Sequence, residues 1–361
     1  MFGKTFQGKS VWVSGHTGFK GSWLTLWLLR LGAKVHGFSL PPPTEPSLFE
    51  QAGLAESIAH EIGDVRDRIA VQQSLLTSTP DFVFHLAAQP LVRRSYLQPL
   101  ETVSTNVIGT AHVLDALREM AKPCIAVIVT SDKCYANNEQ DRAFTEVDHL
   151  GGHDPYSASK AACEILTSAY RDSYFQNSPV RVSSARAGNV IGGGDWAHDR
   201  LVPDCIRALS KGSPIQIRNP DSIRPWQHVL EPLGGYLRLA QAMTQNSKLC
   251  GAYNFGPSLS ARLSVLEIVR QVLELWPGSY EILKDPSAPA EAKLLQLSID
   301  KARSDLGWSP ILGQEDSVKW TLDWYQSSEK SPSQIREFTE NQLFGYERLA
   351  AGFGMIWEDS I

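Results

Sequence analysis

The stretch SVWVSGHTGFKGSW, residues 10–23, decides the fold of this chain. Its first five residues form a short apolar run typical of a buried strand, and apolar residues spaced three and four apart over 19–31 predict a helix. Glycines in the turn between them allow close backbone approach, and the helix N-terminus attracts an anion, so the pattern predicts a site for a dinucleotide pyrophosphate. The residues expected there are Gly15, His16, Thr17, Gly18, Phe19, Lys20 and Gly21.

Apolar runs and helical patterns keep alternating as far as about residue 188. Such alternation indicates right-handed strand–helix–strand units and a parallel sheet, so we expect an α/β fold with a Rossmann-like, doubly wound sheet. Helices are expected from about Pro99 to Met120, and from a cap at Asp154 toward Tyr174. The further strands are expected at Lys34–Phe38, His60–Ile62, Phe82–Leu86, Ile125–Thr130 and Val182–Ala185.

The composition changes after about residue 188, where Gly192–Gly194 form a turn and Pro, Trp and Arg become frequent. Helical patterns return at Leu263–Trp276 and Ser317–Tyr325. We expect residues 1–188, with about 225–256, to form the dinucleotide-binding domain. Residues 189–224 and about 257–361 are expected to form a smaller, mixed α/β substrate-binding lobe.

Composition and charge argue against several classes of protein. The chain has 361 residues, a net charge of −5 and scattered Lys and Arg, so we expect no nucleic-acid partner. The most apolar stretch, Trp23–Leu31, is too short to span a bilayer, and we expect no membrane association. Five cysteines without a Cys-x-x-Cys pair predict reduced thiols and a cytoplasmic location, and the histidines show no metal-ligand spacing, so no metal is expected.

The second strand ends without the acidic residue that usually holds the ribose of NAD, because Ser39 follows Phe38 there, and no Arg replaces it. The residues alone therefore leave NAD and NADP both open. Asp64 and Val65 follow the third strand, where they are expected to meet the adenine; the alternative is that Asp64 caps a helix from Arg66 onward.

Tyr156 and Lys160 lie four residues apart, on one face of the helix that follows the fifth strand. A neighbouring cation and the positive nicotinamide ring both favour the phenolate over the phenol, so we expect the pKa of Tyr156 to fall. Such a phenolate could take a proton from a sugar hydroxyl while a hydride leaves the same carbon.

Together these motifs resemble the extended short-chain dehydrogenase/reductase family, over nearly the whole chain. Leu86, Ala87, Ala88 and Gln89 are similar to its loop under the cofactor, and Asn106 matches its helix asparagine. The resemblance implies NAD as cofactor and a homodimer or homotetramer. Family members pair through the helices around Pro99–Met120 and Tyr156–Tyr174.

Ser131-Asp132-Lys133, at the end of the fifth strand, resembles the sugar-nucleotide 4,6-dehydratases within that family. Members acting on dTDP-glucose carry Asp-Glu here, and the Asp-Lys form resembles those acting on CDP-glucose. The resemblance implies that Asp132 acts as acid, Lys133 as base at C5, and that Ser131 binds the C4 oxygen beside Tyr156. An idle surface ion pair between Asp132 and Lys133 is the alternative.

The second half of the chain resembles the substrate lobe of the same family. Asn189, Leu201 and Arg224 match positions expected to bind the nucleotide sugar, and Arg94 is a further candidate that could instead form a salt bridge. Residues 215–218 are expected to line the nucleotide pocket, with Leu201-Val202-Pro203.

Two other functions remain to be weighed against a CDP-glucose 4,6-dehydratase activity. A 4-epimerase, or a dehydratase for a dTDP-, GDP- or UDP-hexose, would share the fold, but an epimerase should lack an ionisable pair after Ser131. A non-catalytic dinucleotide sensor should have lost Tyr156 or Lys160, and both are present.

Overall fold

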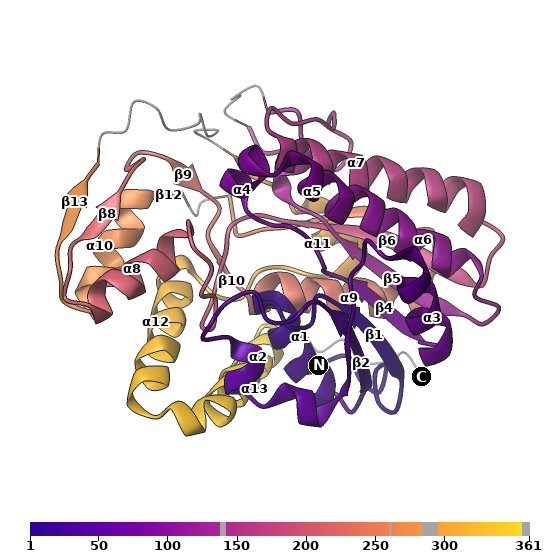
Figure 1. The fold of residues 1–361 in the computed structure, drawn as a ribbon, viewed down its shortest axis with the longest axis horizontal. Helices are drawn as coiled ribbons and strands as arrows, with labels where there is room; N and C mark the ends of the chain where they lie inside the picture. The colour runs from indigo at the N-terminus through magenta and orange to yellow at the C-terminus, as the bar shows by residue number, and fades with distance from the viewer. Residues whose placement is uncertain (138–141, 260–261, 284–294, 356–361) are drawn as a thin grey trace.

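The computed structural model describes residues 1–137, 142–259, 262–283 and 295–355. A sheet of seven parallel strands lies at its centre, in the order β11-β6-β5-β4-β1-β2-β3 (Figure 1). The order 3-2-1-4-5-6 within it is that of a dinucleotide-binding sheet, so the predicted doubly wound α/β fold is confirmed.

The strands of the sheet are short, as expected for a parallel sheet covered on both faces. They are β1 (Ser10–Ser14), β2 (Lys34–Ser39), β3 (Ala59–Ile62), β4 (Phe82–His85), β5 (Cys124–Val129), β6 (Val180–Ala187) and β11 (Ala252–Phe255). Six short strands form separate pairs outside it: β7 (Val190–Ile191), β8 (Ile215–Ile217), β9 (Ile223–Arg224), β10 (Gln227–His228), β12 (Leu263–Ser264) and β13 (Tyr280–Ile282).

The helices of the first half are α1 (Phe19–Arg30), α2 (Leu48–Gln51), α3 (Arg68–Ser78), α4 (Val92–Leu97), α5 (Pro99–Val103), α6 (Gly109–Arg118) and α7 (Pro155–Tyr170). Those of the second half are α8 (Leu201–Ser210), α9 (Leu230–Gln245), α10 (Val265–Leu275), α11 (Asp300–Leu306), α12 (Gln314–Lys330) and α13 (Ile335–Gly352).

Successive side chains of β1 serve the two faces of the sheet, because side chains alternate along a strand. Val11 and Val13 pack into the core that contains α1 and α9, whereas Trp12 between them packs into the core that contains α3 and α6. The indole of Trp12 donates a hydrogen bond to Ser74 of α3 (3.1 Å), so even the polar edge of this buried ring is satisfied. The sheet is therefore fixed from both sides.

The smaller lobe lies beyond the carboxyl ends of the sheet strands, where β8, β13, α8, α10 and α12 are grouped (Figure 1). The loop of residues 192–200 joins this lobe to β7. Tyr325 of α12 fixes the loop by donating a hydrogen bond to the carbonyl of Asp195 (2.5 Å). The domain boundaries at about residues 188, 225 and 256 stay a prediction.

Two predicted helices end differently from expectation. The helix predicted over Pro99–Met120 is divided into α5 and α6 by a π-helical turn at Ser104–Ile108, and α7 ends in a second such turn at Arg171–Phe175. Asp64 does not cap α3, because Asp67 does so by accepting from the backbone N–H groups of Ile69 and Ala70.

Candidate active site

A cavity of about 730 Å³ opens where the carboxyl ends of the sheet strands meet the smaller lobe. This is the position at which doubly wound α/β proteins bind their ligands. Nearly all the predicted site residues line it: the glycine loop except His16, residues 64–65, 86–89 and 131–133, and Arg94, Tyr156, Lys160, Asn189, Leu201 and Arg224. His16 and Asn106 are absent from the lining.

The glycine loop lies against the chain just after β4 more closely than any side chain would permit. A Cβ at Gly15, whose φ is +75°, would lie 2.7 Å from the backbone nitrogen of Ala87, and one at Gly21 would lie 2.0 Å from the carbonyl oxygen of Gly15. Gly18 faces the cavity, with only the Gly15 carbonyl within 4 Å of a Cβ built on it. The residues present therefore fit a dinucleotide pyrophosphate at the N-terminus of α1.

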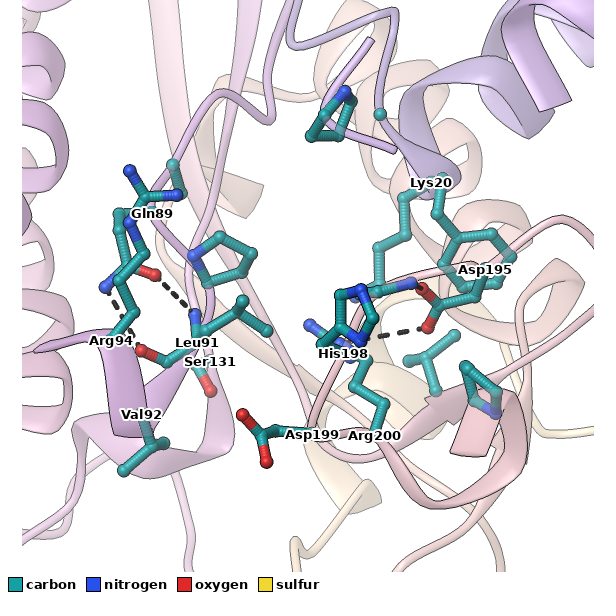
Figure 2. Close-up of a pocket in the computed structure, with 18 of the residues that line it drawn as sticks. Lys20, Gln89, Leu91, Val92, Arg94, Ser131, Asp195, His198, Asp199 and Arg200 are labelled. Carbon is teal, nitrogen blue, oxygen red and sulfur yellow. Dashed lines mark hydrogen bonds and ion pairs between the residues drawn. The ribbon is translucent and has the colours of Figure 1, made fainter. Parts of the chain in front are cut away.

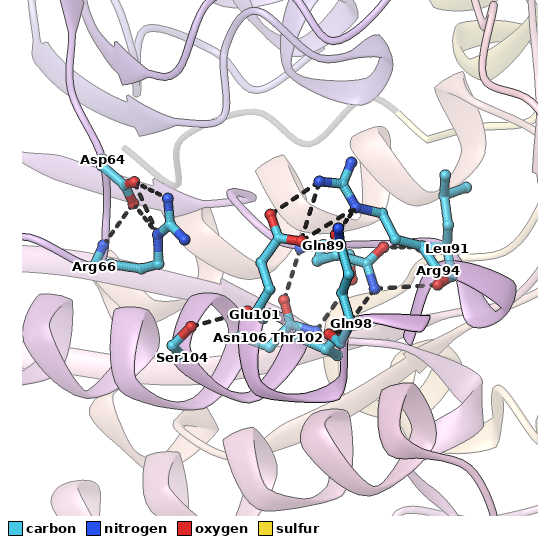
Figure 3. Close-up of polar contacts among 10 residues, drawn as sticks. All are labelled: Asp64, Arg66, Gln89, Leu91, Arg94, Gln98, Glu101, Thr102, Ser104 and Asn106. Atoms are coloured by element: carbon cyan, nitrogen blue, oxygen red, sulfur yellow. Dashed lines mark hydrogen bonds and ion pairs between the residues drawn. The ribbon is translucent and has the colours of Figure 1, made fainter. Parts of the chain in front are cut away.

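A pair of hydroxyl groups takes the place of the missing acid at the end of β2. Thr17 and Ser39 hydrogen-bond through their side chains (2.9 Å), and the Thr17 hydroxyl also donates to the Leu40 carbonyl (2.9 Å). At the end of β3, Asp64 accepts from the backbone N–H of Arg66 (2.9 Å) and pairs with its guanidinium (Figure 3). The guanidinium lowers the pKa of Asp64, so this wall of the cavity keeps an anion.

Asn106 and His16 act behind the cavity wall. Asn106 accepts from the backbone N–H of Gln89 (2.8 Å) and donates to its carbonyl (3.1 Å), which fixes the 86–89 loop (Figure 3). The His16 ring instead bonds His60 (2.7 Å) and fills the space that Gly37 leaves open, where a Cβ would lie 2.5 Å from it. Burial lowers the pKa of His16 to about 3, so the ring is neutral.

Asp132, Lys133 and Cys134 form a short 3₁₀ turn after β5, and Ser131 is its N-cap. Ser131 accepts from the backbone N–H of Lys133 (3.2 Å), and its hydroxyl donates to Asp132 Oδ1 (3.0 Å). Asp132 is 2% exposed, and its Oδ2 has no hydrogen-bond partner in the described parts of the chain. Within those same parts the two charges form no ion pair, so the alternative of an idle surface pair is wrong.

Tyr156 and Lys160 reach the cavity from the first two turns of α7, which Asp154 caps by accepting from the backbone N–H of Ser157 (2.9 Å). Lys160 Nζ donates to the carbonyl of Val129 at the end of β5 (3.4 Å). Both side chains are buried, so desolvation disfavours the charged form of the Lys160 amine and of the Tyr156 phenol.

In the protein alone the pKa of Tyr156 is raised, and its expected fall beside a positive nicotinamide stays a prediction. Burial raises this pKa to about 12, and a hydrogen-bonding interaction with Ser131 acts in the opposite direction without overcoming burial. Burial also lowers the pKa of Lys160. The tyrosine is thus a phenol at neutral pH until a further positive charge enters the site.

The opposite wall carries a group of charges, only partly exposed, that includes one residue of the glycine loop (Figure 2). Lys20 projects toward Asp195, and the Asp195 carboxylate lies 3.8 Å from Arg200 Nε. Burial lowers the pKa of Lys20 to about 7, and the neighbouring Arg200 adds to this effect. Burial raises the pKa of Asp195, against the effect of Arg200.

At the rim of the cavity, Asp199 lies between two arginines that come from different lobes. Its Oδ1 is 2.9 Å from Arg218 Nη1 and 3.8 Å from Arg93 Nη1, and all three side chains are about one-third exposed. Arg94 lines the cavity and pairs with Glu101 (2.9 Å), so the expected alternative of a salt bridge is confirmed, and binding of substrate by Arg94 stays a prediction (Figure 3).

The predicted substrate residues lie along the same half of the cavity. Arg224 is 5% exposed and donates to the carbonyl of Ile223 (3.0 Å), while the Asn189 carbonyl accepts from the backbone of Gln227 (3.1 Å). Leu201 begins α8 and lines the wall beside residues 215–219.

Sequence reasoning did not single out Arg93, Asp199 or Arg200. For Asp199 and Arg200 the sequence signal was their place shortly after the glycine run at 192–194. Among the described residues there is no group of three His, Cys, Asp or Glu side chains that could hold a metal. No described helix combines the length and apolar character needed to cross a membrane.

Comparisons with known proteins agree with this geometry. The chain is 46% identical over 352 residues to CDP-glucose 4,6-dehydratase of Salmonella typhimurium LT2, which covers 94% of this chain and 98% of the relative. A solved structure of dTDP-glucose 4,6-dehydratase from Bacillus anthracis in complex with NAD matches with a TM-score of 0.75 at 20% identity, covering 91% of this chain and all of that one.

An epimerase structure from Methanothermobacter thermautotrophicus matches with a TM-score of 0.77 at 23% identity, over 92% of this chain and 96% of that one. At these identities the two structures show the shared fold alone. The family model described as GDP-mannose 4,6 dehydratase matches residues 12–321, which is most of the chain. On that match and on the 46% identity over nearly the whole chain, the protein belongs to the GDP-mannose 4,6 dehydratase family.

Proposed function

We propose that this protein is an NAD-dependent 4,6-dehydratase that converts CDP-D-glucose to CDP-4-dehydro-6-deoxy-D-glucose and water. One observation carries the proposal: Ser131, Asp132 and Lys133 at the end of β5 share one cavity with Tyr156 and Lys160 of α7 and with the glycine loop of α1. The 46% identity to a CDP-glucose 4,6-dehydratase supports the choice of nucleotide.

NAD, when bound, would supply the hydride acceptor for oxidation at C4 and the hydride donor for reduction at C6. The residues that would hold it are Gly15, Thr17, Gly18, Phe19, Lys20, Gly21, Asp64, Val65, Leu86, Ala87, Ala88, Gln89, Tyr156 and Lys160. His16 and Asn106 would contribute from behind the wall, by setting the shape of the loops that they support.

Tyr156 is the proposed base for the C4 hydroxyl of the sugar. Since burial raises its pKa to about 12, the phenolate needs the positive charge of the oxidised cofactor and of Lys160 to become accessible near neutral pH. Ser131 would hydrogen-bond the same oxygen, because its hydroxyl lies on the cavity wall beside the phenol.

Asp132 and Lys133 are the proposed pair for the elimination. Lys133 would remove the C5 hydrogen as a proton, which the adjacent C4 ketone makes acidic, and Asp132 would protonate the departing C6 hydroxyl so that it leaves as water. Lys133 would then return a proton to C5 as hydride adds at C6. The unpartnered Asp132 Oδ2 supports this role, because a buried carboxyl oxygen without a hydrogen bond can accept or donate one to a substrate hydroxyl. Lys133 is half-buried and lines the same cavity.

Asn189, Leu201, Arg224 and Arg94 are the proposed contacts for the nucleotide sugar. A guanidinium matches phosphate oxygens in pairs, so Arg224 is the proposed ligand of the diphosphate. The pairing of Arg94 with Glu101 leaves that arginine less free to bind an anion.

A substrate panel tests the proposal. Purified protein is incubated with CDP-, dTDP-, GDP- and UDP-glucose, and the 4-keto product is measured by its absorbance in alkali. The highest kcat/KM is expected with CDP-glucose. Higher turnover of another nucleotide would exclude the CDP assignment, 4-epimerised product without ketone would indicate an epimerase, and cofactor binding without turnover of any sugar would indicate a sensor.

We also propose a homodimer or a dimer of dimers that pairs through α5, α6 and α7, in the cytoplasm. Apolar side chains on and around these helices are strongly exposed, with Leu97 and Leu100 each 83% exposed and Ile165 57% exposed. The five cysteines are free, as reduced cytoplasmic thiols would be. Light scattering of the wild type and of Leu100→Glu tests the pairing; an unchanged mass would exclude this surface.

A further inference from the structure

A buried ion pair beneath the cavity has no part in the chemistry proposed above. Glu164 Oε2 on α7 lies 2.7 Å from Arg186 Nη2 on β6, and the two side chains are 2% and 4% exposed. Ser184, also on β6, donates its hydroxyl to the same Oε2 (2.7 Å). Charges this deep in a protein persist only when each finds its partners, so the pair is rigidly placed.

The first contact that matters lies just before Ser131, Asp132 and Lys133, which together are called the catalytic segment. The hydroxyl of Thr130, the residue after β5, donates to Glu164 Oε1. The backbone N–H of Thr130 donates to the Ala185 carbonyl (2.9 Å). Residue 130 is therefore held both by the sheet and by the carboxylate.

The second contact lies just after the catalytic segment. Arg186 Nη1 donates to the hydroxyl of Tyr135 (2.7 Å), which in turn donates to Asn254 Oδ1 on β11 (2.7 Å). The guanidinium also lies over the Tyr135 ring, 4.9 Å from its centroid. Tyr135 is 1% exposed, so its position depends on these contacts and on packing.

We propose that the Glu164–Arg186 ion pair is a positioning device that holds both ends of the segment carrying Ser131, Asp132 and Lys133. Glu164 fixes the residue before the segment, and Arg186 fixes a residue after it. The claim rests on the proposed function, because it assigns these two residues to the geometry of the elimination. Neither lines the cavity, so both act through other residues.

The same helix places the other half of the site. Glu164 is one turn beyond Lys160 on α7, and Lys160 Nζ donates to the Val129 carbonyl, one residue before Thr130. Tyr156, Lys160 and the catalytic segment are thus all positioned by α7 and the end of β5. Since a displacement of 1 Å can cost about 10²-fold in rate, loosening either end should reduce turnover.

Three conservative variants separate positioning from stability. Thr130→Val and Tyr135→Phe each remove one hydroxyl from an end of the segment. Ser184→Ala is the matched control, because it also removes one hydroxyl from Glu164, but on β6 and away from the segment. We expect kcat to fall roughly 10- to 100-fold in the first two and to stay within about twofold in the control, with KM changed little in all three.

Comparable melting temperatures in Thr130→Val and Ser184→Ala are part of the expected result, and Thr130→Ser, which keeps the hydroxyl, should restore most of kcat. A wild-type kcat in Thr130→Val would overturn the inference, as would full activity of Tyr135→Phe.

Hydrogen exchange of residues 131–135 in the same variants provides a readout that needs no substrate. We expect faster exchange in Thr130→Val and Tyr135→Phe than in the wild type and Ser184→Ala. Absence of wild-type turnover on every sugar would reject the proposed function alone, whereas unchanged exchange would reject the positioning role.

Discussion

Two buried glutamates, Glu164 and Glu231, lie in regions that use a carboxylate in different ways. Glu164 faces the Arg186 guanidinium beneath the catalytic segment. Glu231, at the start of α9, is fully buried and accepts from the backbone N–H groups of Ile311 (2.9 Å) and Leu312 (2.6 Å) and from the Tyr346 hydroxyl (2.9 Å). In the described parts of the chain no Lys or Arg forms an ion pair with it.

The contrast shows what a cation partner provides. Burial raises the pKa of Glu231 to about 7, against the hydrogen bonds that it accepts, so its charge is easily lost. The carboxyl at the junction of α9 with α13 is therefore readily protonated, whereas the Glu164 carboxylate beneath the site faces a guanidinium. Changes near Glu164 should therefore act on turnover, and changes at Glu231 on the pH dependence of stability.

The largest effect on turnover is expected at Tyr156, the proposed base for the first step. Tyr156→Phe removes the proposed base and should lower kcat about 10⁴-fold, at the upper end of what general base catalysis contributes, without unfolding the chain. The assay is turnover of CDP-glucose, with circular dichroism to check the fold. Tyr170→Phe, at the far end of the same helix, is the control and should keep full activity; retention of the rate in Tyr156→Phe would remove Tyr156 from the mechanism.

Lys133→Ala should lower turnover about 10³-fold, because the C5 hydrogen loses its proposed base. Cofactor binding should be unchanged, since Lys133 is at the sugar end of the proposed site. The direct measurement is exchange of the C5 hydrogen with deuterated water, followed by NMR. Lys122→Ala, which removes a surface lysine paired with Asp81, is the control. Exchange at the wild-type rate in Lys133→Ala would contradict the assignment.

Glu231→Gln probes the other side of the comparison. The usual pKa of this carboxyl, 4.5, rises to about 7 on folding, so its contribution to stability is present below pH 4.5 and is lost as the pH rises through 7. The difference corresponds to about 3 kcal/mol above pH 7. A glutamine should remove this loss, because its oxygen can accept from both backbone N–H groups and its amide can donate to Tyr346.

Urea unfolding at pH 5 and pH 8 measures the effect, as the change in free energy of unfolding relative to the wild type. Glu231→Gln should gain stability at pH 8 and little at pH 5, while turnover stays unchanged. The exposed Glu274→Gln is the control. A gain of the same size at both pH values would show that titration of Glu231 is not the cause.

Much of the sheet, and many of the residues that line the cavity, could be predicted because both depend on local sequence signals. Buried parallel strands are contiguous apolar runs, and the six predicted strands lie within about two residues of β1 to β6. β11 was missed because Ala252–Phe255 is short and includes a buried polar residue. Asn254 is satisfied by the carbonyls of Phe144 and Ser298, which lie far away in sequence.

The parts of the site that sequence reasoning missed depend on contacts between distant elements. His16 was predicted to bind the cofactor from its place in the glycine loop, but Gly37 on β2 leaves a space that its ring fills. Arg93 and Asp199 were not predicted, and although residues 215–218 were expected to line the pocket, nothing in these separate segments indicates that Asp199 meets both Arg93 and Arg218. The shifted pKa of Tyr156 likewise depends on how fully the assembled fold buries it.

The smallest effect is expected at Asp199 on the rim of the cavity, because its side chain is exposed whereas those of Glu164 and Glu231 are buried. Asp199→Asn keeps the side-chain shape and suits the positive φ of 59° at this position. Losing the carboxylate leaves Arg93 and Arg218 free to attract an anionic substrate, so KM for CDP-glucose should fall. Exposed ion pairs contribute at most about 1 kcal/mol, which limits the change to roughly fivefold, and kcat should not move. Since salt screens such charges, the fall in KM should shrink at high ionic strength; an effect on kcat instead would place Asp199 within the rigid part of the site.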